Sequence, residues 1–515
     1  MNRSGSVVCL ALSCAAALAS GVSGCSSGRP APFETQDGAS SSGGGSGSGS
    51  GGNFSSFDAG GGSYEASDCP DGGTTSISGT VYDPAGNNPL YDVAVYVPGS
   101  PLQPLPSGVP TGADACSCAA LFKSQAISTT TTKVDGSFTL TNVPAGKAVP
   151  LVVQVGKWRR SLHVDVAACQ DNPQPDKSLK LPSTVAPGDT DDNMPDIAVS
   201  TGVADTLECL MMRIGLPASE LVAGASTAGH VHVFAGGQPG GTGDHTIGRP
   251  ALPAFTNAPT SFTDLWATQA QLMAYDIALF SCEGGETYDA NPPALEAYLN
   301  AGGRVFASHY HYAWFGGPIA SGKWYVPPLP AEYAAPADWG TNLATWTKDT
   351  GGSENLIGGV IDTTLNGATG SFAKGVALQS WLQETGALGQ NGVPAGQLSI
   401  YQPKYNATVT AANTRSQPWI TAGAMSSLPG ATMYFSFDTP VDAPAAADGG
   451  APQYCGRAVY SDLHVAGDPS TTDVPPAPGG CASGPLSPQE KALEFMLFDL
   501  SSCVIPDNQP PQITQ

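Results

Sequence analysis

From residue 196 onward, short apolar runs alternate with segments of helical periodicity, and this alternation is the feature that most constrains the fold. The apolar runs have the length of buried strands and lie at residues 196–202, 230–237, 276–282 and 304–309. The intervening segments carry apolar side chains at helical spacing and lie at residues 204–215, 263–275 and 291–303. Strands that alternate with helices predict a doubly wound parallel sheet with helices on both faces.

Capping residues mark where several of these helices begin. Asn291 is followed by two prolines, which is typical of an N-cap and the first helical positions. Asp205 with Glu208 resembles a capping box at the start of the first helix. A last capped helix is predicted at residues 487–500, with Leu493 on its inward face.

Residues 74–182 have a different, strand-like pattern. Apolar and polar residues alternate, so that Val93, Val95 and Val97 fall on one face. The predicted strands are separated by turn residues and lie at residues 76–83, 91–99, 128–134, 136–143 and 150–158. Short strands at regular spacing predict a small all-β sandwich. The chain is therefore expected to be multidomain.

The stretches "ISGTVYDPAGNNPLYDVAVYVPG" and "DGSFTLTNVPAG" in this region resemble the carboxypeptidase regulatory-like domain, which has a prealbumin-like sandwich fold. The resemblance implies a rigid accessory module, in some members with a carbohydrate-binding-like surface, and no catalysis. Trp158, Arg159 and Arg160 could form a ligand patch, because an aromatic face with guanidinium groups suits sugars or carboxylates. The alternative is an edge strand with a partly buried tryptophan and solvated arginines.

The N-terminus has the pattern of an export signal. Residues 1–24 contain a basic start, an apolar stretch and small residues, which are the parts of a secretory signal peptide. Val22, Ser23, Gly24 and Cys25 resemble the lipobox of bacterial lipoproteins, which implies that Cys25 carries the lipid. Ser26 after it resembles the pattern of Gram-negative proteins sorted to the outer membrane. A plain signal peptide is the alternative.

Residues 25–73 are expected to be a lipidated cysteine and a flexible, disordered linker. The sequence "GASSSGGGSGSGSGG" lacks the apolar content that would offset chain entropy. About 40 such residues have a root-mean-square reach of roughly 35 Å, enough to hold a folded body clear of a bilayer.

The charge balance limits the partners. The formal net charge is -23, with 20 lysines and arginines, which argues against nucleic acid and against electrostatic binding to anionic lipid. Membrane attachment must then rest on the lipid anchor. A carbohydrate or another envelope component is the expected partner, and the cell envelope is the expected location.

Cysteine usage agrees with an oxidising compartment. Without Cys9, Cys14 and Cys25, nine of the 12 cysteines remain, so three or four disulfides are expected and at least one thiol is left over. For Cys282, a disulfide with Cys209 or Cys503 is favoured over a reactive thiolate. The disulfide candidates are Cys209, Cys282, Cys455, Cys481 and Cys503.

The stretches "YDIALFSCEGG", "GGRVFASH" and "RAVYSDLH" resemble the class I glutamine amidotransferase-like superfamily, in particular its trehalose-utilisation (ThuA-like) branch. The resemblance implies a flavodoxin-like α/β domain at residues 196–505, with an insertion at about 318–430. A linker at residues 183–195 precedes it and a tail at 506–515 follows. Glutaminases of this superfamily have a cysteine at the nucleophile elbow, where this chain has Ser308 and His309, so a glutaminase triad is disfavoured.

Ligands of parallel sheets lie beyond the carboxyl ends of the strands. The candidate catalytic residues there are Ser308, His309, Glu283, Asp462 and His464. The favoured interpretation is a binding or structural scaffold built on this domain. The alternative is an extracytoplasmic hydrolase-like enzyme acting on a saccharide or amide. In that enzyme His309 and His464 would be acid and base, and Glu283 or Asp462 would orient them.

A zinc site is a further hypothesis. His309, His311 and His464 could be the ligands, with Glu283 or Asp462 supplying a carboxylate. The alternative is packing, in which His309 bonds to nearby backbone and the aromatic residues that follow it form a lid.

The first prediction concerns the anchor. Cys25→Ala should release the protein from membranes or stall its processing, because the lipid is the expected membrane attachment. Membrane fractionation and N-terminal sequencing measure both effects. Unchanged fractionation with a normally cleaved N-terminus would exclude the lipid anchor.

Overall fold

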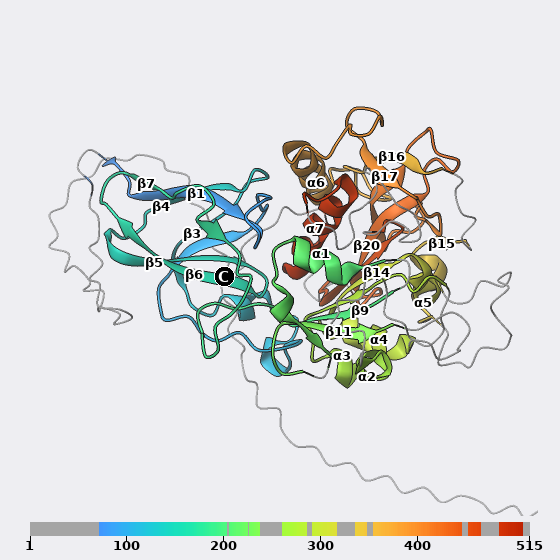
Figure 1. Ribbon diagram of the computed structural model, residues 1–515, viewed down its shortest axis with the longest axis horizontal. Helices are drawn as coiled ribbons and strands as arrows, with labels where there is room; N and C mark the ends of the chain where they lie inside the picture. The colour runs from blue at the N-terminus through green and yellow to red at the C-terminus, as the bar shows by residue number, and fades with distance from the viewer. Residues whose placement is uncertain are drawn as a thin grey trace, which may run out of the picture. The chain divides into compact units, whose positions relative to one another are not determined.

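The computed structural model describes residues 69, 72–202, 205–224, 226–236, 260–285, 291–316, 335–347, 354–444, 452–464 and 484–507 (Figure 1). The signal peptide, the lipidation site Cys25 and Cys481 lie outside these residues. Two small sheets and one large mixed sheet make up most of the described structure. No helix within these ranges is both long and apolar enough to cross a membrane.

Residues 72–182, here called the β module, form two four-stranded sheets. One has the order β4-β1-β7 with β8 also paired to β1, and the other has the order β3-β2-β5-β6. Val95 and Val97 point into the main core, while Ala94 and Tyr96 belong to a separate small cluster, so the predicted alternation is confirmed. The elements are β1 (Ser76–Tyr82), β2 (Ala94–Pro98), η2 (Gly112–Asp114), η3 (Cys118–Leu121), β3 (Ala126–Thr131), β4 (Ser137–Thr141), β5 (Gly146–Val155), β6 (Trp158–Val166), β7 (Asp171–Pro173) and β8 (Leu179–Lys180).

Residues 196–507, here called the α/β body, are built on one 11-stranded sheet. Six neighbouring strands, in the order β10-β11-β9-β13-β14-β21, are all parallel, and the short β12 pairs with β11. The parallel sheet expected from the alternating pattern is therefore present. Its strands are β9 (Ile197–Ser200), β10 (Leu221–Ala223), β11 (Val231–Ala235), β12 (Thr260–Ser261), β13 (Ile277–Phe280), β14 (Arg304–Ser308) and β21 (Gly456–Ser461).

The other half of the large sheet is antiparallel. It continues from β21 through β20 (Thr432–Thr439), β19 (Ser416–Ala422), β16 (Leu356–Ile361) and β17 (Leu398–Tyr401). Two further strands, β15 (Thr345–Trp346) and β18 (Ala407–Thr408), form a separate pair. The insertion predicted at about 318–430 thus supplies three strands that extend the sheet.

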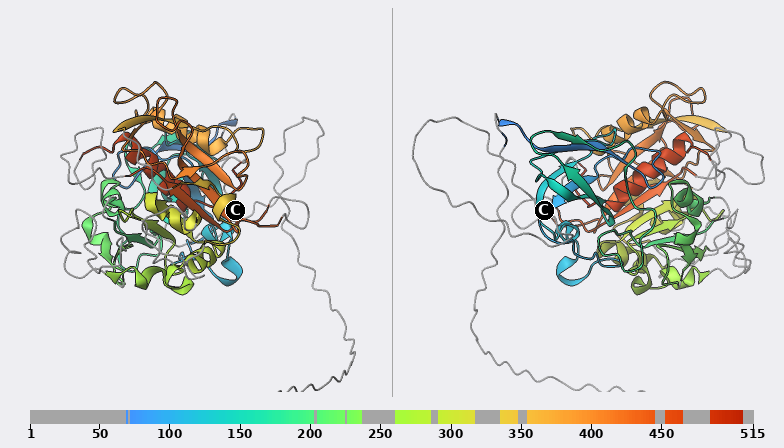
Figure 2. Two further views of the ribbon diagram at one scale, coloured as in Figure 1. Left: turned by 90° about the vertical axis from the view of Figure 1, so that its right-hand side faces the viewer. Right: turned by 60° about the vertical axis from the view of Figure 1, so that its left-hand side comes forward.

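Helices cover both faces of the large sheet (Figure 1, Figure 2). Alternate strand residues belong to different clusters: Ile277 and Leu279 pack with α1, α6 and α7, whereas Ala278 and Phe280 pack with α2 to α5. This alternation is the period-two geometry of a strand buried on both sides. The helices are α1 (Leu207–Arg213), α2 (Thr263–Trp266), α3 (Gln269–Leu272), α4 (Pro292–Asn300), α5 (Tyr312–Gly316), α6 (Ala373–Glu384) and α7 (Pro488–Ser501), with short turns η4 (Ala218–Glu220), η5 (His309–His311) and η7 (Gly340–Asn342).

Two helices differ from the sequence prediction, one by an interruption and one in its N-cap. The helix expected at residues 263–275 is two short helices, because Thr268 has extended backbone angles and caps α3 through a capping box with Gln271. The capping box expected from Asp205 and Glu208 is also wrong, since Thr206 is the N-cap of α1 and makes no side-chain cap bond. The Asn291 cap of α4 is confirmed.

The β module and the α/β body share one hydrophobic core. The ring of Trp158 meets Phe498 of α7 edge-on at 5.8 Å between centroids, and Tyr91 stacks on Phe495 at 6.0 Å. Trp381 of α6 donates its indole N–H to the Pro89 carbonyl over 2.6 Å. The module is therefore packed against α6 and α7 as part of the body's own core.

Three disulfides are present among the described residues. Cys69–Cys169 lies within the β module, whereas Cys116–Cys455 and Cys118–Cys503 join the module to the body. Cys209 is also disulfide-bonded. The expectation that Cys282 pairs with Cys209 or Cys503 is wrong, because Cys282 is a free, buried thiol.

A buried pair of carboxyl groups also lies between the two parts. Glu494 of α7 accepts a 2.6 Å bond from the Asn88 side chain and is hydrogen-bonded to Asp83. Burial and then the charge of Asp83 raise the pKa of Glu494 well above its usual value. Burial likewise raises the pKa of Asp83. Lys491 is the cation that acts on Glu494 in the opposite direction.

The second prediction concerns this pair. A carboxyl group whose pKa is raised by folding binds its proton more tightly when folded, so it destabilises the protein as the pH rises above its unfolded pKa. Glu494→Gln keeps the shape and a hydrogen-bonding group but cannot ionise. We expect this variant to gain thermal stability over the wild type at about pH 8 and to lose that advantage near about pH 4.

Thermal unfolding followed by circular dichroism measures the difference. Glu384→Gln, at an exposed position on α6, is the matched control and should show no comparable pH dependence. A Glu494→Gln advantage that is equal at both pH values would contradict a titrating carboxyl pair.

Candidate functional site

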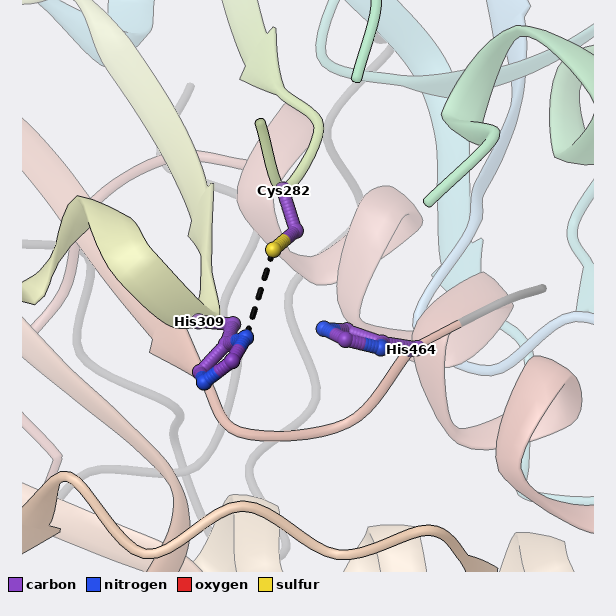
Figure 3. A group of neighbouring side chains, drawn as sticks. All are labelled: Cys282, His309 and His464. Carbon is purple, nitrogen blue, oxygen red and sulfur yellow. Dashed lines mark hydrogen bonds between the residues drawn. The ribbon is translucent and has the colours of Figure 1, made fainter. Parts of the chain in front are cut away.

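Three adjacent parallel strands end at the same edge of the sheet and bring Cys282, His309 and His464 together (Figure 3). Cys282 follows β13, His309 follows β14 and His464 follows β21. The Cys282 sulfur lies 3.2 Å from Nδ1 of His309, and the two imidazole rings lie 5.1 Å apart between centroids. The predicted meeting of His309 and His464 is therefore observed, across 155 residues of chain.

The backbone at His309 has an uncommon conformation. Its φ is +44°, in the left-handed region, where a residue with a Cβ is strained by about 1–3 kcal/mol. Ser308 before it is still extended, so the chain turns sharply at the end of β14. The Tyr460 hydroxyl, on the neighbouring strand, lies 2.8 Å from the His309 carbonyl oxygen and helps to hold this turn.

Two carboxylates are tied to this edge by hydrogen bonds. Asp205 accepts a 2.7 Å bond from the Ser308 hydroxyl. Asp462 lies 2.7 Å from the Tyr460 hydroxyl and accepts a 2.9 Å bond from the backbone N–H of Asn406. Both carboxylates therefore have positioning contacts, and Ser308 is buried with its hydroxyl directed to Asp205.

Burial dominates the electrostatics of Cys282. It raises the pKa of the thiol to about 12, and the charge of Asp205 acts in the same direction. The backbone N–H groups of Gly284 and Tyr310 and the charge of Lys404 lower it. Cys282 is therefore a neutral thiol near neutral pH, rather than a thiolate nucleophile.

His311, predicted as a metal ligand, lies apart from this group. Its Nδ1 is 2.8 Å from the Ser308 carbonyl oxygen, and its ring packs edge-on against Trp314 at 4.3 Å. Burial lowers the pKa of His311 to about 4, so the ring is neutral. The predicted triad of histidines is thus corrected: Cys282 takes the third place in the group, because the chain turns after His309 and carries His311 into the helix layer.

Glu283, a candidate to orient the histidines, is buried, with 1 % of its surface exposed. Gly236 follows β11, and a Cβ built on it would lie 3.1 Å from Oε1 of Glu283. The Glu283 side chain therefore lies beside the end of that strand. Glu283 therefore lies at the same edge of the sheet as the other predicted residues, in a closed environment.

The residues of the predicted ligand patch on the β module are mostly buried. Trp158 is 0 % exposed and Arg159 is 2 % exposed, and only Arg160 remains partly accessible. Trp158 packs on Phe498, and the Arg159 guanidinium donates to the carbonyls of Gln103, Thr190 and Asp191. The prediction of a ligand patch is therefore wrong, because segments distant in the sequence cover two of its three side chains.

Sequence reasoning also missed several residues of the site. Asp205 was interpreted as a helix cap, although its position after β9 places it at the carboxyl edge. Lys404 and Asn406 come from the insertion, and no local pattern marks them. Comparison with models of known families, with curated proteins and with solved structures found no match.

Proposed function

We propose that this protein is a lipid-anchored protein of the bacterial cell envelope whose α/β body binds a small ligand at the carboxyl edge of its parallel strands. The observation that carries this proposal is the convergence of Cys282, His309 and His464 at that edge. Buried titratable groups that meet at a strand edge are more typical of a site than of simple packing.

The strand order supports a flavodoxin-like interpretation of the body. When the three-residue edge strand β10 is left aside, the strands β9, β11, β13, β14 and β21 lie as 2-1-3-4-5 in chain order, the order of flavodoxin-like sheets. The two four-stranded sheets of the β module fit a prealbumin-like sandwich of the carboxypeptidase regulatory-like type. In this proposal the module is an accessory part that packs against α6 and α7, and the residues of the site belong to the body.

Binding is favoured over cysteine-based hydrolysis by the state of the thiol. A cysteine nucleophile works as a thiolate or is activated by a base. Here burial raises the pKa of Cys282 to about 12 although His309 Nδ1 lies 3.2 Å from its sulfur, and His309 instead of a nucleophile occupies the sharp turn after β14.

A hydrolase-like enzyme acting on a saccharide or amide is the second candidate. It is favoured by the short distance between the His309 and His464 rings, since two imidazoles can divide into proton donor and acceptor. Asp462, held by Tyr460 and Asn406, would orient groups at this site.

The third prediction separates binding from cysteine-based hydrolysis through the reactivity of the thiol. Native protein should react slowly with iodoacetamide at Cys282, because the thiol is buried and neutral. The labelling rate should rise about tenfold per pH unit between about pH 7 and 9, as the thiolate fraction grows. Peptide mapping by mass spectrometry measures labelling at this position.

Protein unfolded in denaturant is the reference for full labelling, and Cys282→Ala identifies the labelled peptide. Rapid native labelling near neutral pH, together with ester or amide hydrolysis that Cys282→Ala abolishes, would overturn the binding proposal.

A further inference from the structure

We propose that Cys282, His309 and His464 bind one thiophilic divalent transition-metal ion of the zinc class. The inference rests on the proposed function, because it names the ligand of the same strand edge. It differs from the sequence hypothesis in its ligand set, which contains a thiol in place of His311.

The distances suit a single ion. One ligand atom from each of the three residues lies within 4.8 Å of the other two. In a tetrahedral zinc site, bonds of about 2.0–2.3 Å place neighbouring ligand atoms about 3.3–3.6 Å apart. The Cys282 sulfur and the His309 nitrogen are already 3.2 Å apart, so small side-chain rotations would bring all three onto one ion.

The ligand chemistry selects the class of ion. A thiolate and two imidazoles are soft and borderline donors, which suit zinc and neighbouring transition metals and do not suit calcium or magnesium. On binding, the S–H bond of Cys282 breaks, a metal–sulfur bond forms, and one proton passes to water. No electron is transferred.

The surroundings hold the ligands in place. The Tyr460 hydroxyl contacts the carbonyl of His309, and the Gln489 side chain of α7 donates to the carbonyl of His464. The N–H groups of Gly284 and Tyr310 donate to the Cys282 sulfur and would stabilise its thiolate. The contacts to the two carbonyls position the backbone that carries the histidines, and the N–H groups lower the basicity of the sulfur.

One carboxylate and one ammonium group act on the sulfur of this centre. One thiolate leaves a single positive charge on the centre, and the Asp205 carboxylate is near enough to act on Cys282. Lys404 acts on the same thiol with opposite sign, so its charge offsets that of Asp205.

The fourth prediction is measured with Co²⁺ as the probe. Full-length protein in detergent, stripped with a chelator under conditions that spare its disulfides, should bind one equivalent. The expected signals are a sulfur-to-cobalt charge-transfer band and the visible bands of tetrahedral Co²⁺. One equivalent of Zn²⁺ should displace the Co²⁺ and remove both signals.

Cys282→Ser should abolish the charge-transfer band, and His464→Ala should weaken binding by more than about 100-fold, since second-sphere partners alone contribute about 10–100-fold. His311→Asn is the matched control and should leave the affinity within about threefold. Circular dichroism and melting verify that each variant folds, and exposed His163→Asn serves as a surface control.

Wild-type protein that binds no Co²⁺, or a Cys282→Ser variant that keeps the affinity and the spectrum, would overturn the inference. If Cys282 still reacts slowly with iodoacetamide, these outcomes do not contradict the proposal that the strand edge binds a small ligand. Rapid thiol labelling with hydrolysis would instead remove the proposed function itself.

Discussion

The parallel pairing of β13, β14 and β21 is the constraint on which the site depends. Phe280 lies opposite Ala307, and Ala307 lies opposite Tyr460, so the three strands run in register to a common edge. Cys282 lies two residues after Phe280, and His309 lies two residues after Ala307. A shift of one residue in either pairing would turn one of these side chains toward the opposite face.

The sequence predicted much of the body because its signals are local. The apolar run that ends at His309 predicted β14, and the Asn-Pro-Pro start of α4 was correct. The convergence of His309 and His464 followed from the geometry of parallel sheets. The place of Cys282 beside His309 could not be predicted in this way, because the sequence does not distinguish a free buried cysteine from a disulfide-bonded one.

Other features depend on contacts that no local pattern contains. Trp158 lies on the edge strand β6, as one of the two interpretations expected, yet its ring is fully buried against Phe498, 340 residues later in the chain. No strand was predicted within the insertion, yet β16, β17 and β19 lie in it and extend the sheet, since strand pairing is decided by the whole assembled edge. Asn406 reaches the Asp462 carboxylate only through this arrangement.

The two bridges between module and body impose an order on oxidative maturation. Cys116 and Cys118 pair with residues 339 and 385 positions further along the chain. Neither bond can close until the chain has been made as far as Cys455 or Cys503, respectively, and the conditions are oxidising. A chain truncated before Cys455 would therefore leave both thiols of the Cys-Ser-Cys segment without their native partners, so correct pairing at this segment reports that the body has been completed as far as Cys503.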